Sequence, residues 1–95
     1  MSEAEFMRQV VQLARLLGWW VHHAHISRGG EAGLPDLVMV KAGRPVVYAE
    51  LKTERGKVTP EQQAVLDLLR TTPSQVFLWR PTDWDEIQRV LGATT

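Results

Sequence analysis

The sequence predicts a small α/β domain in which a mixed four-stranded sheet is covered by helices on both faces. Apolar residues recur with the period of a helix in some segments and with that of a strand in others, in the order α-β-β-β-α-β-α. The chain has 95 residues, which is enough for one domain and too few for two. We therefore expect residues 1–95 to form a single domain.

The first element is expected to be a helix that begins after Ser2 and ends at Gly18. Serine is a favoured N-cap residue, and the acidic side chains of Glu3 and Glu5 suit the positive end of a helix. Glycine commonly follows the last turn of a helix. Between these ends, apolar residues recur at helical spacing: Phe6, Val10, Leu13 and Leu17.

Three strands are expected next, at residues 19–26, 36–41 and 45–52. The first reads WWVHHAHI. It is separated from the second by SRGGEAG, which contains three glycines and is interpreted as a loop. The second and third strands are close enough in sequence to form a hairpin.

The second half of the chain predicts a helix, a strand and a further helix. After a loop at residues 53–58, Thr59 is a natural N-cap residue and Pro60 suits the first helical position. The strand is expected at residues 74–79 and the last helix at residues 81–91. The apolar face of the helix that follows Thr59 is assigned to Val65, Leu68 and Leu69.

The predicted hairpin carries charged residues at one end of an otherwise apolar pair of strands. If its turn centres on Gly43, Asp36 lies directly opposite Glu50, and opposed residues point to the same face. Lys52 lies two residues beyond Glu50 and therefore shares that face. We expect these three ionisable groups to converge at one end of the sheet. The other face of the hairpin is apolar: Leu37, Met39, Val47, Ala49 and Leu51.

Two opposed carboxylates repel each other unless a positive charge lies between them. Lys52 could supply that charge, and the hard oxygens of Asp36 and Glu50 also suit Mg²⁺ or Mn²⁺. A metal there would activate water and neutralise a phosphate, while Lys52 orients or deprotonates the water or stabilises developing charge. This arrangement is equipped to cleave a phosphodiester. The alternative is a surface ion pair at a sheet edge, because such short patterns arise often by chance.

Three segments, GLPDLVMV, AELK and GKVTPEQ, together resemble the virus-type replication-repair nuclease (VRR-NUC) domain of the PD-(D/E)xK nuclease superfamily. The resemblance extends over nearly the whole chain and implies a restriction-endonuclease-like core with metal-dependent phosphodiester cleavage. It assigns the metal-binding acids to Asp36 and Glu50 and the lysine to Lys52. It also implies that Gln62 belongs to the site and that the carbonyl of Leu51 is a further metal ligand.

The same resemblance implies a glutamate on the first helix, and Glu3 and Glu5 are the candidates. Helical phase favours Glu3, which lies on the stripe of Phe6 and Val10. Glu5 is adjacent to Phe6 in sequence and is rotated from it by about 100°. Glu3 is therefore the predicted member of the catalytic set. The alternative for either acid is simple complementarity to the positive end of the helix.

The two loops that flank the predicted site carry the candidate DNA contacts. These are Ser27 and Arg28 in the first loop, and Arg55 and Lys57 in the second. Basic loop residues suit phosphates, which carry no sequence code. Ordinary surface charge is the alternative for each of these basic residues.

Other polar and aromatic residues are assigned structural roles. Lys41 and Arg44, at the far turn of the hairpin, are interpreted as ordinary surface charge. His23 and His25 point to the same face of their strand, but two histidines without a third ligand make a poor zinc site. Core or dimer packing is expected for the four tryptophans: Trp19, Trp20, Trp79 and Trp84.

Composition excludes several classes of protein. Lysine plus arginine and aspartate plus glutamate each number 11, so the net charge of zero argues against binding of nucleic acid by bulk charge alone. The absence of cysteine excludes disulfide scaffolds, zinc–thiolate sites and thiol catalysis. No apolar run suits a signal peptide or a membrane span, so a soluble, cytoplasmic protein is expected.

The sequence thus predicts a Mg²⁺- or Mn²⁺-dependent, structure-selective DNA endonuclease. We expect a homodimer acting on branched DNA such as four-way (Holliday) junctions, because no element suits reading of base edges and the resemblance implies a role in DNA repair. A non-catalytic DNA-binding or assembly module of the same fold, a flap nuclease and an RNA nuclease are the alternatives.

Overall fold

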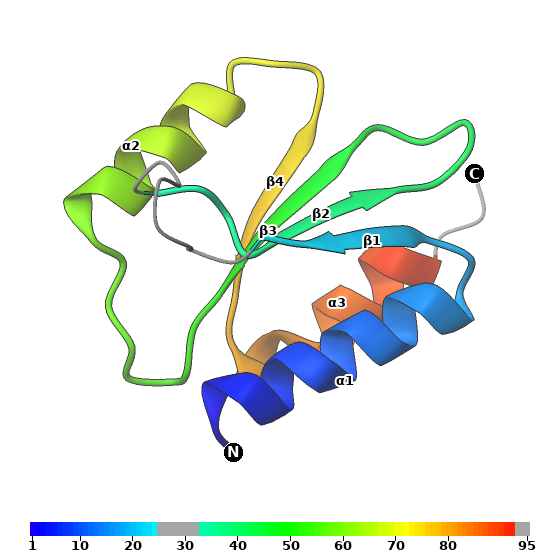
Figure 1. The fold of residues 1–95 in the computed structure, drawn as a ribbon, viewed down its shortest axis with the longest axis horizontal. Coiled ribbons are helices and arrows are strands. Elements are labelled where there is room, and N and C mark those ends of the chain that lie inside the picture. The colour runs from blue at the N-terminus through cyan, green and yellow to red at the C-terminus, as the bar shows by residue number, and fades with distance from the viewer. Residues whose placement is uncertain (25–32, 93–95) are drawn as a thin grey trace.

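The computed structural model describes residues 1–24 and 33–92, and its element order is the predicted one. A mixed four-stranded sheet in the order β1-β2-β3-β4 is flanked by helices (Figure 1). Strand β2 runs antiparallel to both β1 and β3, whereas β3 and β4 are parallel. The elements are α1 (Glu3–Leu16), β1 (Trp20–His23), β2 (Leu37–Val40), β3 (Val47–Leu51), α2 (Pro60–Leu69), β4 (Gln75–Trp79), the 3-10 turn η1 (Pro81–Asp83) and α3 (Trp84–Gly92).

The helices form layers on the two faces of the sheet. Helices α1 and α3 lie side by side on one face, and α2 lies on the other (Figure 1). The main core lies between the sheet and helices α1 and α3, because alternate strand residues point to that side. Its fully buried side chains are Phe6, Val10, Ala14, Leu37, Met39, Val47, Ala49, Leu51, Trp79, Ile87 and Leu91. The apolar face predicted for the hairpin is therefore confirmed.

The register of the hairpin is also the predicted one. Leu37 is paired with Ala49 and Met39 with Val47. Gly43 at the turn has a φ of 75°, a left-handed conformation that glycine adopts without steric cost. Extended by one residue beyond the Leu37–Ala49 pair, the same register places Asp36 opposite Glu50.

Helix α1 begins as expected and buries a slightly different stripe. The Ser2 hydroxyl accepts from the Glu5 N–H at 3.1 Å, and the Glu5 carboxylate accepts from the Ser2 N–H at 3.0 Å, which is a capping box. The buried stripe passes through Ala14, whereas Leu13 and Leu17 are only partly buried beside it.

The apolar face predicted for α2 is wrong in part. Leu66 is the buried residue of this helix, and Leu68 is 68% exposed. Val65 and Leu69 are partly buried. Leu68 lies about 200° around the helix from Leu66, so the two residues cannot both face the sheet.

Two of the remaining elements have different bounds from those expected. Strand β1 ends at His23, and residues 25–26 of the predicted strand lie outside the described residues. The last helix is preceded by η1, where the Asp83 carboxylate accepts from the Arg80 N–H at 2.8 Å. Among the helices of the described residues, none is long and apolar enough to cross a membrane.

Candidate active site

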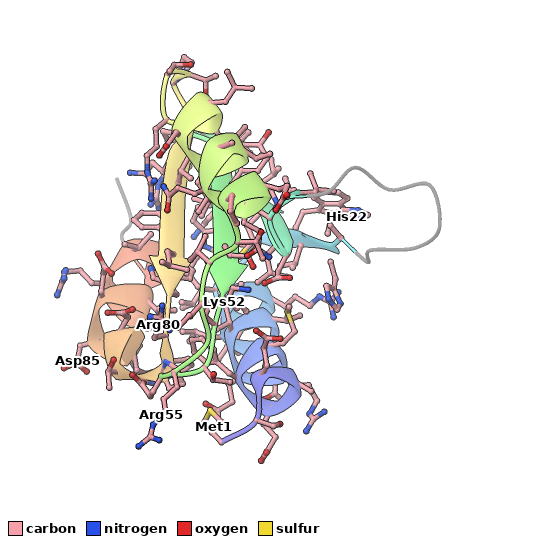
Figure 2. All side chains as sticks on the ribbon, turned by 90° about the vertical axis from the view of Figure 1, so that its left-hand side faces the viewer. Met1, His22, Lys52, Arg55, Arg80 and Asp85 are labelled. Carbon is pink, nitrogen blue, oxygen red and sulfur yellow. The ribbon has the colours of Figure 1, made fainter. Side chains whose placement is uncertain are left out.

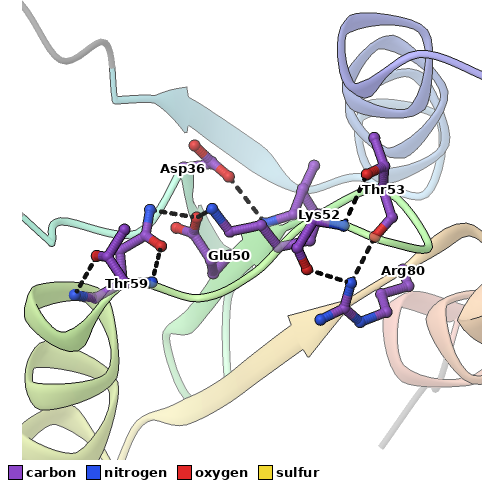
Figure 3. Close-up of polar contacts among 9 residues, drawn as sticks. Asp36, Glu50, Lys52, Thr53, Thr59 and Arg80 are labelled. Carbon is purple, nitrogen blue, oxygen red and sulfur yellow. Dashed lines mark hydrogen bonds and ion pairs between the residues drawn. The ribbon is translucent and has the colours of Figure 1, made fainter.

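The three ionisable groups of the hairpin converge where β2 begins and β3 ends (Figure 3). Asp36 Oδ2 accepts from the Leu51 N–H at 2.8 Å, so the aspartate is held across the two strands. Glu50 Oε2 lies 3.5 Å from Lys52 Nζ. It also accepts from Gln62 Nε2 at 3.0 Å. The hairpin and the start of α2 thus bring together four of the five side chains that the sequence assigned to this site.

Gly33 brings the start of α2 against the segment that leads to Asp36. It has a φ of 91°, and a Cβ atom there would lie 2.4 Å from the Glu61 carbonyl oxygen and 2.9 Å from Val65. Any side chain at this position would push the helix away. The glycine of the GLPD segment is therefore required for Gln62, in the first turn of α2, to reach Glu50.

The amide of Gln62 is oriented by the cap of its own helix. The side-chain Oε1 of Gln62 accepts from the Thr59 N–H at 2.9 Å, and the backbone N–H of Gln62 donates to the Thr59 hydroxyl at 3.1 Å. This capping box leaves the NH₂ group as the end that faces Glu50. Gln62 thus works as a donor to the carboxylate and as a helix cap at once.

Lys52 does not fully compensate the burial of the Asp36 and Glu50 carboxylates, whose pKa values are both raised. Glu50 is only 2% exposed, and its Oε1 has no hydrogen-bond partner among the described residues. Burial and then the charge of Asp36 raise the pKa of Glu50 to about 7, against the opposing effect of Lys52. Burial also raises the pKa of Asp36, while the Leu51 N–H, Lys52 and His23 act in the other direction.

An unpartnered, buried carboxylate oxygen beside a second carboxylate fits a hard divalent cation. No group of three or more histidine, cysteine, aspartate or glutamate side chains capable of holding a metal occurs in residues 1–24 and 33–92. Asp36 and Glu50 would therefore supply only part of a coordination shell. Mg²⁺ tolerates this because it retains several waters. The Leu51 carbonyl as a third ligand stays a prediction.

The first-helix acids lie differently. Glu5 is committed to the capping box, and hydrogen bonds from Ser2 lower its pKa. Glu3 and Glu5 both line a groove beside α1 that reaches His23 and Asp36. Because the carboxylate of Glu5 caps its own helix, Glu3 remains the first-helix candidate, and its role stays a prediction.

The predicted DNA contacts divide between the two loops. Ser27 and Arg28 lie outside the described residues. Arg55 and Lys57 are exposed on the loop after Lys52. Figure 2 shows the Arg55 side chain pointing outward, away from Lys52. Their contact with DNA stays a prediction.

The sequence reasoning missed the residues that hold this loop. Arg80 Nη1 donates to the carbonyl oxygens of Thr53 at 2.5 Å, Gly56 at 2.7 Å and Glu54 at 3.3 Å. The Glu54 carboxylate in turn accepts from the N–H of Thr82 at 2.7 Å and from its hydroxyl at 3.1 Å. No local pattern could reveal these contacts, because the partners are more than twenty residues apart in sequence.

Lys41 and Arg44, at the far turn, have structural roles more specific than surface charge. Lys41 Nζ donates to the Leu17 carbonyl at the end of α1, at 2.8 Å. Arg44 Nη2 donates to the Val90 carbonyl near the end of α3, at 3.1 Å, and its guanidinium stacks over Trp19. Both cations thus bind carbonyls that the helix itself leaves free.

The tryptophans divide between the core and the surface. Trp19 and Trp79 are buried, and Trp19 Nε1 donates to the Leu91 carbonyl at 2.9 Å. Trp84 is partly buried against the core. Trp20 is 62% exposed and its ring stacks on His22.

The fold and the carboxylate–lysine cluster define the chain as an α/β protein with a nuclease-like site, and comparison with known proteins identifies its family. The VRR-NUC domain model matches residues 2–82. A solved structure described as a VRR_NUC domain superposes with a TM-score of 0.77 at 19% identity, covering 98% of this chain and 97% of that chain. Comparison with curated proteins gives no match.

The chain belongs to the VRR-NUC family, as the resemblance of its motifs predicted. The similar solved structure confirms the predicted fold, since 19% identity supports the fold alone. Membership implies a nuclease-type function in DNA processing, and nucleases of this family generally use a divalent metal.

Proposed function

We propose that this protein is a Mg²⁺- or Mn²⁺-dependent endodeoxyribonuclease whose reaction takes place at Asp36, Glu50 and Lys52. One observation carries the proposal: Glu50 is almost fully buried beside Asp36, and one of its oxygens has no partner among the described residues. A pure binding module gains nothing from two opposed carboxylates, because they repel phosphate.

Each side chain has a separate task in this proposal. Asp36 and Glu50, with the Leu51 carbonyl, would hold the divalent cation, which would supply Lewis acidity and neutralise charge on the phosphate. Lys52 positions or deprotonates the attacking water and stabilises the charge that develops on the phosphate. Gln62 keeps the Glu50 side chain in place through its 3.0 Å hydrogen bond, and Glu3 supports the site from α1.

A cleavage assay with matched variants tests the proposal. Chelator should abolish cleavage, and Mg²⁺ or Mn²⁺ should restore it. Asp36→Asn retains an acceptor for the Leu51 N–H but lacks the charge, so it should fold and lose at least about 100-fold in rate. Lys52→Ala should lose a similar factor. Full activity in either folded variant would show that the reaction occurs elsewhere, and binding without cleavage in wild type would favour the non-catalytic module.

We propose branched DNA as the substrate and a homodimer as the working form. The basic side chains of Arg55 and Lys57 suit phosphates, and no element of the described residues resembles a recognition helix for base edges. Four-way junction, flap, linear duplex and the corresponding RNA should be compared at matched salt. Best cleavage of linear duplex or of RNA would overturn the choice of substrate.

The exposed face of β1 and β2 supports pairing with a second copy. Trp20 is 62% and Val40 39% exposed, and the two are paired neighbours on the half of the sheet that α2 leaves open. A stable dimer buries roughly 800 Å² on each partner. Light scattering at micromolar concentration should give twice the monomer mass for wild type and a monomer for Trp20→Ser. A fully active wild-type monomer would contradict the proposal.

A further inference from the structure

A groove runs beside α1 and opens toward the end of the sheet where the carboxylates of Asp36 and Glu50 lie. Its residues extend along the helix from Glu3 to Arg15, which is about 18 Å at 1.5 Å per residue. At the sheet side it is bounded by His23 and Asp36. The hydrogen bond between the Ala24 N–H and the Asp36 carbonyl, at 2.8 Å, fixes these two sides together. The groove therefore leads directly to one of the proposed metal ligands.

Two arginines line the groove along the middle and the end of α1, whereas two acids, Glu3 and Glu5, line it at the start of the helix. Arg8, Gln12 and Arg15 follow one another at intervals of four and three residues, so they lie along the same side of α1. Neither arginine makes a hydrogen bond or a close ion pair with the described residues, although the charge of Arg8 acts on the exposed Glu5 carboxylate one turn away. Five other cations of the described residues bind carbonyls or carboxylates: Lys41, Arg44, Lys52, Arg70 and Arg80. Arg55, Lys57 and Arg89 make no such contact, but they lie outside the groove. The two arginines of α1 are thus available for a ligand.

The floor of the groove is apolar. Met7 and Val11 line it and are partly buried against the core, while Arg8, Gln12 and Arg15 are exposed at its rim. An unpaired strand can use both surfaces, because its bases and sugars cover apolar side chains while its phosphates meet guanidinium groups. A duplex presents mainly phosphates outward and would leave the floor uncovered. The groove therefore fits an unpaired strand better than a duplex.

We propose that this groove binds an unpaired DNA strand that leads to Asp36. The proposal rests on the proposed function for the chemistry at Asp36, and it narrows the substrate to branched DNA that has a single-stranded arm. The two arginines are about 10.5 Å apart along the helix. At the roughly 3.4 Å per nucleotide of a strand in a duplex, this spans about three nucleotides and the whole groove about five. An unpaired strand is more extended, so these numbers are upper bounds.

Binding measured without metal separates this proposal from cleavage. Fluorescence anisotropy in chelator would use a labelled 20-base-pair duplex with oligo-dT arms of 0 to 10 nucleotides. Wild-type affinity should rise as the arm lengthens and should level off by about five nucleotides. The double variant Arg8→Gln with Arg15→Gln should lose this rise, about tenfold for the long arm, and the salt dependence of binding should flatten by about 1.4 in log–log slope.

The matched control is Arg70→Gln with Arg89→Gln, which removes two charges from exposed positions outside the groove and should keep the rise. Glutamine is a good helix former, and a thermal melt checks that each variant is folded. Gln12→Glu is a second test, because it adds a negative charge between the arginines and should weaken arm binding alone.

Each possible outcome decides one of the two proposals. If arm length has no effect in wild type, or if the α1 double variant retains the rise, the groove is not the strand site, even where metal-dependent cleavage is intact. If wild type cleaves no DNA but arm binding depends on Arg8 and Arg15, the groove proposal stands and the proposed function fails.

Discussion

The two ends of the central hairpin both carry charged residues, but these residues are partnered at one end and only partly partnered at the other. At the turn, Lys41 and Arg44 each bind a helix carbonyl, so their charges are satisfied within the fold. At the open end, Glu50 is buried and Asp36 partly buried, Lys52 lies 3.5 Å from Glu50, and the second Glu50 oxygen has no partner among the described residues. Satisfied charge stabilises a fold, whereas unsatisfied buried charge costs stability and is typical of a functional site.

The largest effect expected from this comparison is in the pH dependence of stability without metal. The pKa of Glu50 is raised from 4.5 to about 7, and that of Asp36 is raised as well, so folding favours their neutral forms. The stability that neutral Glu50 contributes is complete below pH 4.5 and is lost as pH rises to about 7. At about 1.4 kcal/mol per pKa unit, the loss is about 3 kcal/mol.

Glu50→Gln should remove this loss. It keeps an acceptor for the Gln62 amide and has no charge, so the variant should be more stable than wild type at pH 8 and nearly equal to it at pH 4. Urea unfolding in chelator measures the difference. Mg²⁺ should stabilise wild type at pH 8 and leave the variant unchanged. If the free energy of unfolding of wild type instead rose relative to that of Glu50→Gln between pH 4 and pH 8, the charge of Glu50 would be satisfied in the fold. That result would contradict the comparison.

A smaller effect is expected at the turn, and it should be structural only. Lys41→Met and Arg44→Met each keep an apolar stem and lose a charged hydrogen bond to a helix carbonyl, which costs about 1–2 kcal/mol. Arg44→Met also loses the stacking on Trp19. Urea unfolding should register both losses, and cleavage per folded molecule should be unchanged. Lys57→Met, at an exposed position, is the control and should change stability by less than about 0.5 kcal/mol.

The comparison also explains how much of the site the sequence could reveal. Asp36 and Glu50 face each other because of the turn at Gly43, and the turn, the alternation and the charges all lie within fifteen residues. Local rules are sufficient there. The same holds for Ser2 and Thr59, whose capping boxes involve residues three positions away.

Long-range packing decided what the sequence could not reveal. The phase of α2, with Leu66 inward and Leu68 exposed, depends on how closely the helix approaches Gly33, and periodicity within ten residues cannot indicate that. The carbonyl targets of Lys41 and Arg44 are likewise far away in sequence. The cation types were visible in the sequence, but their partners required the fold.

The smallest effect concerns Arg80. At the functional end of the hairpin, this cation binds backbone carbonyls, as Lys41 and Arg44 do at the turn. It holds carbonyls of the loop after Lys52, just as the turn cations hold helix carbonyls. The Lys52 backbone is fixed separately, because its N–H donates to the Trp79 carbonyl at 3.0 Å. Arg80 should therefore govern the part of the loop that carries Arg55 and Lys57, and leave the position of Lys52 itself nearly unchanged.

Arg80→Lys tests this division, because the shorter lysine side chain does not carry its ammonium to the place of Nη1, the atom that contacts all three carbonyls. On the proposed function, KM for DNA should rise about three- to tenfold while kcat stays within about twofold, because substrate contacts loosen and the reacting groups do not. Amide exchange of Gly56, whose N–H lies in the same turn, should accelerate. A fall in kcat at unchanged KM would contradict this division. It would show that Arg80 controls the position of Lys52 as well as that of the loop.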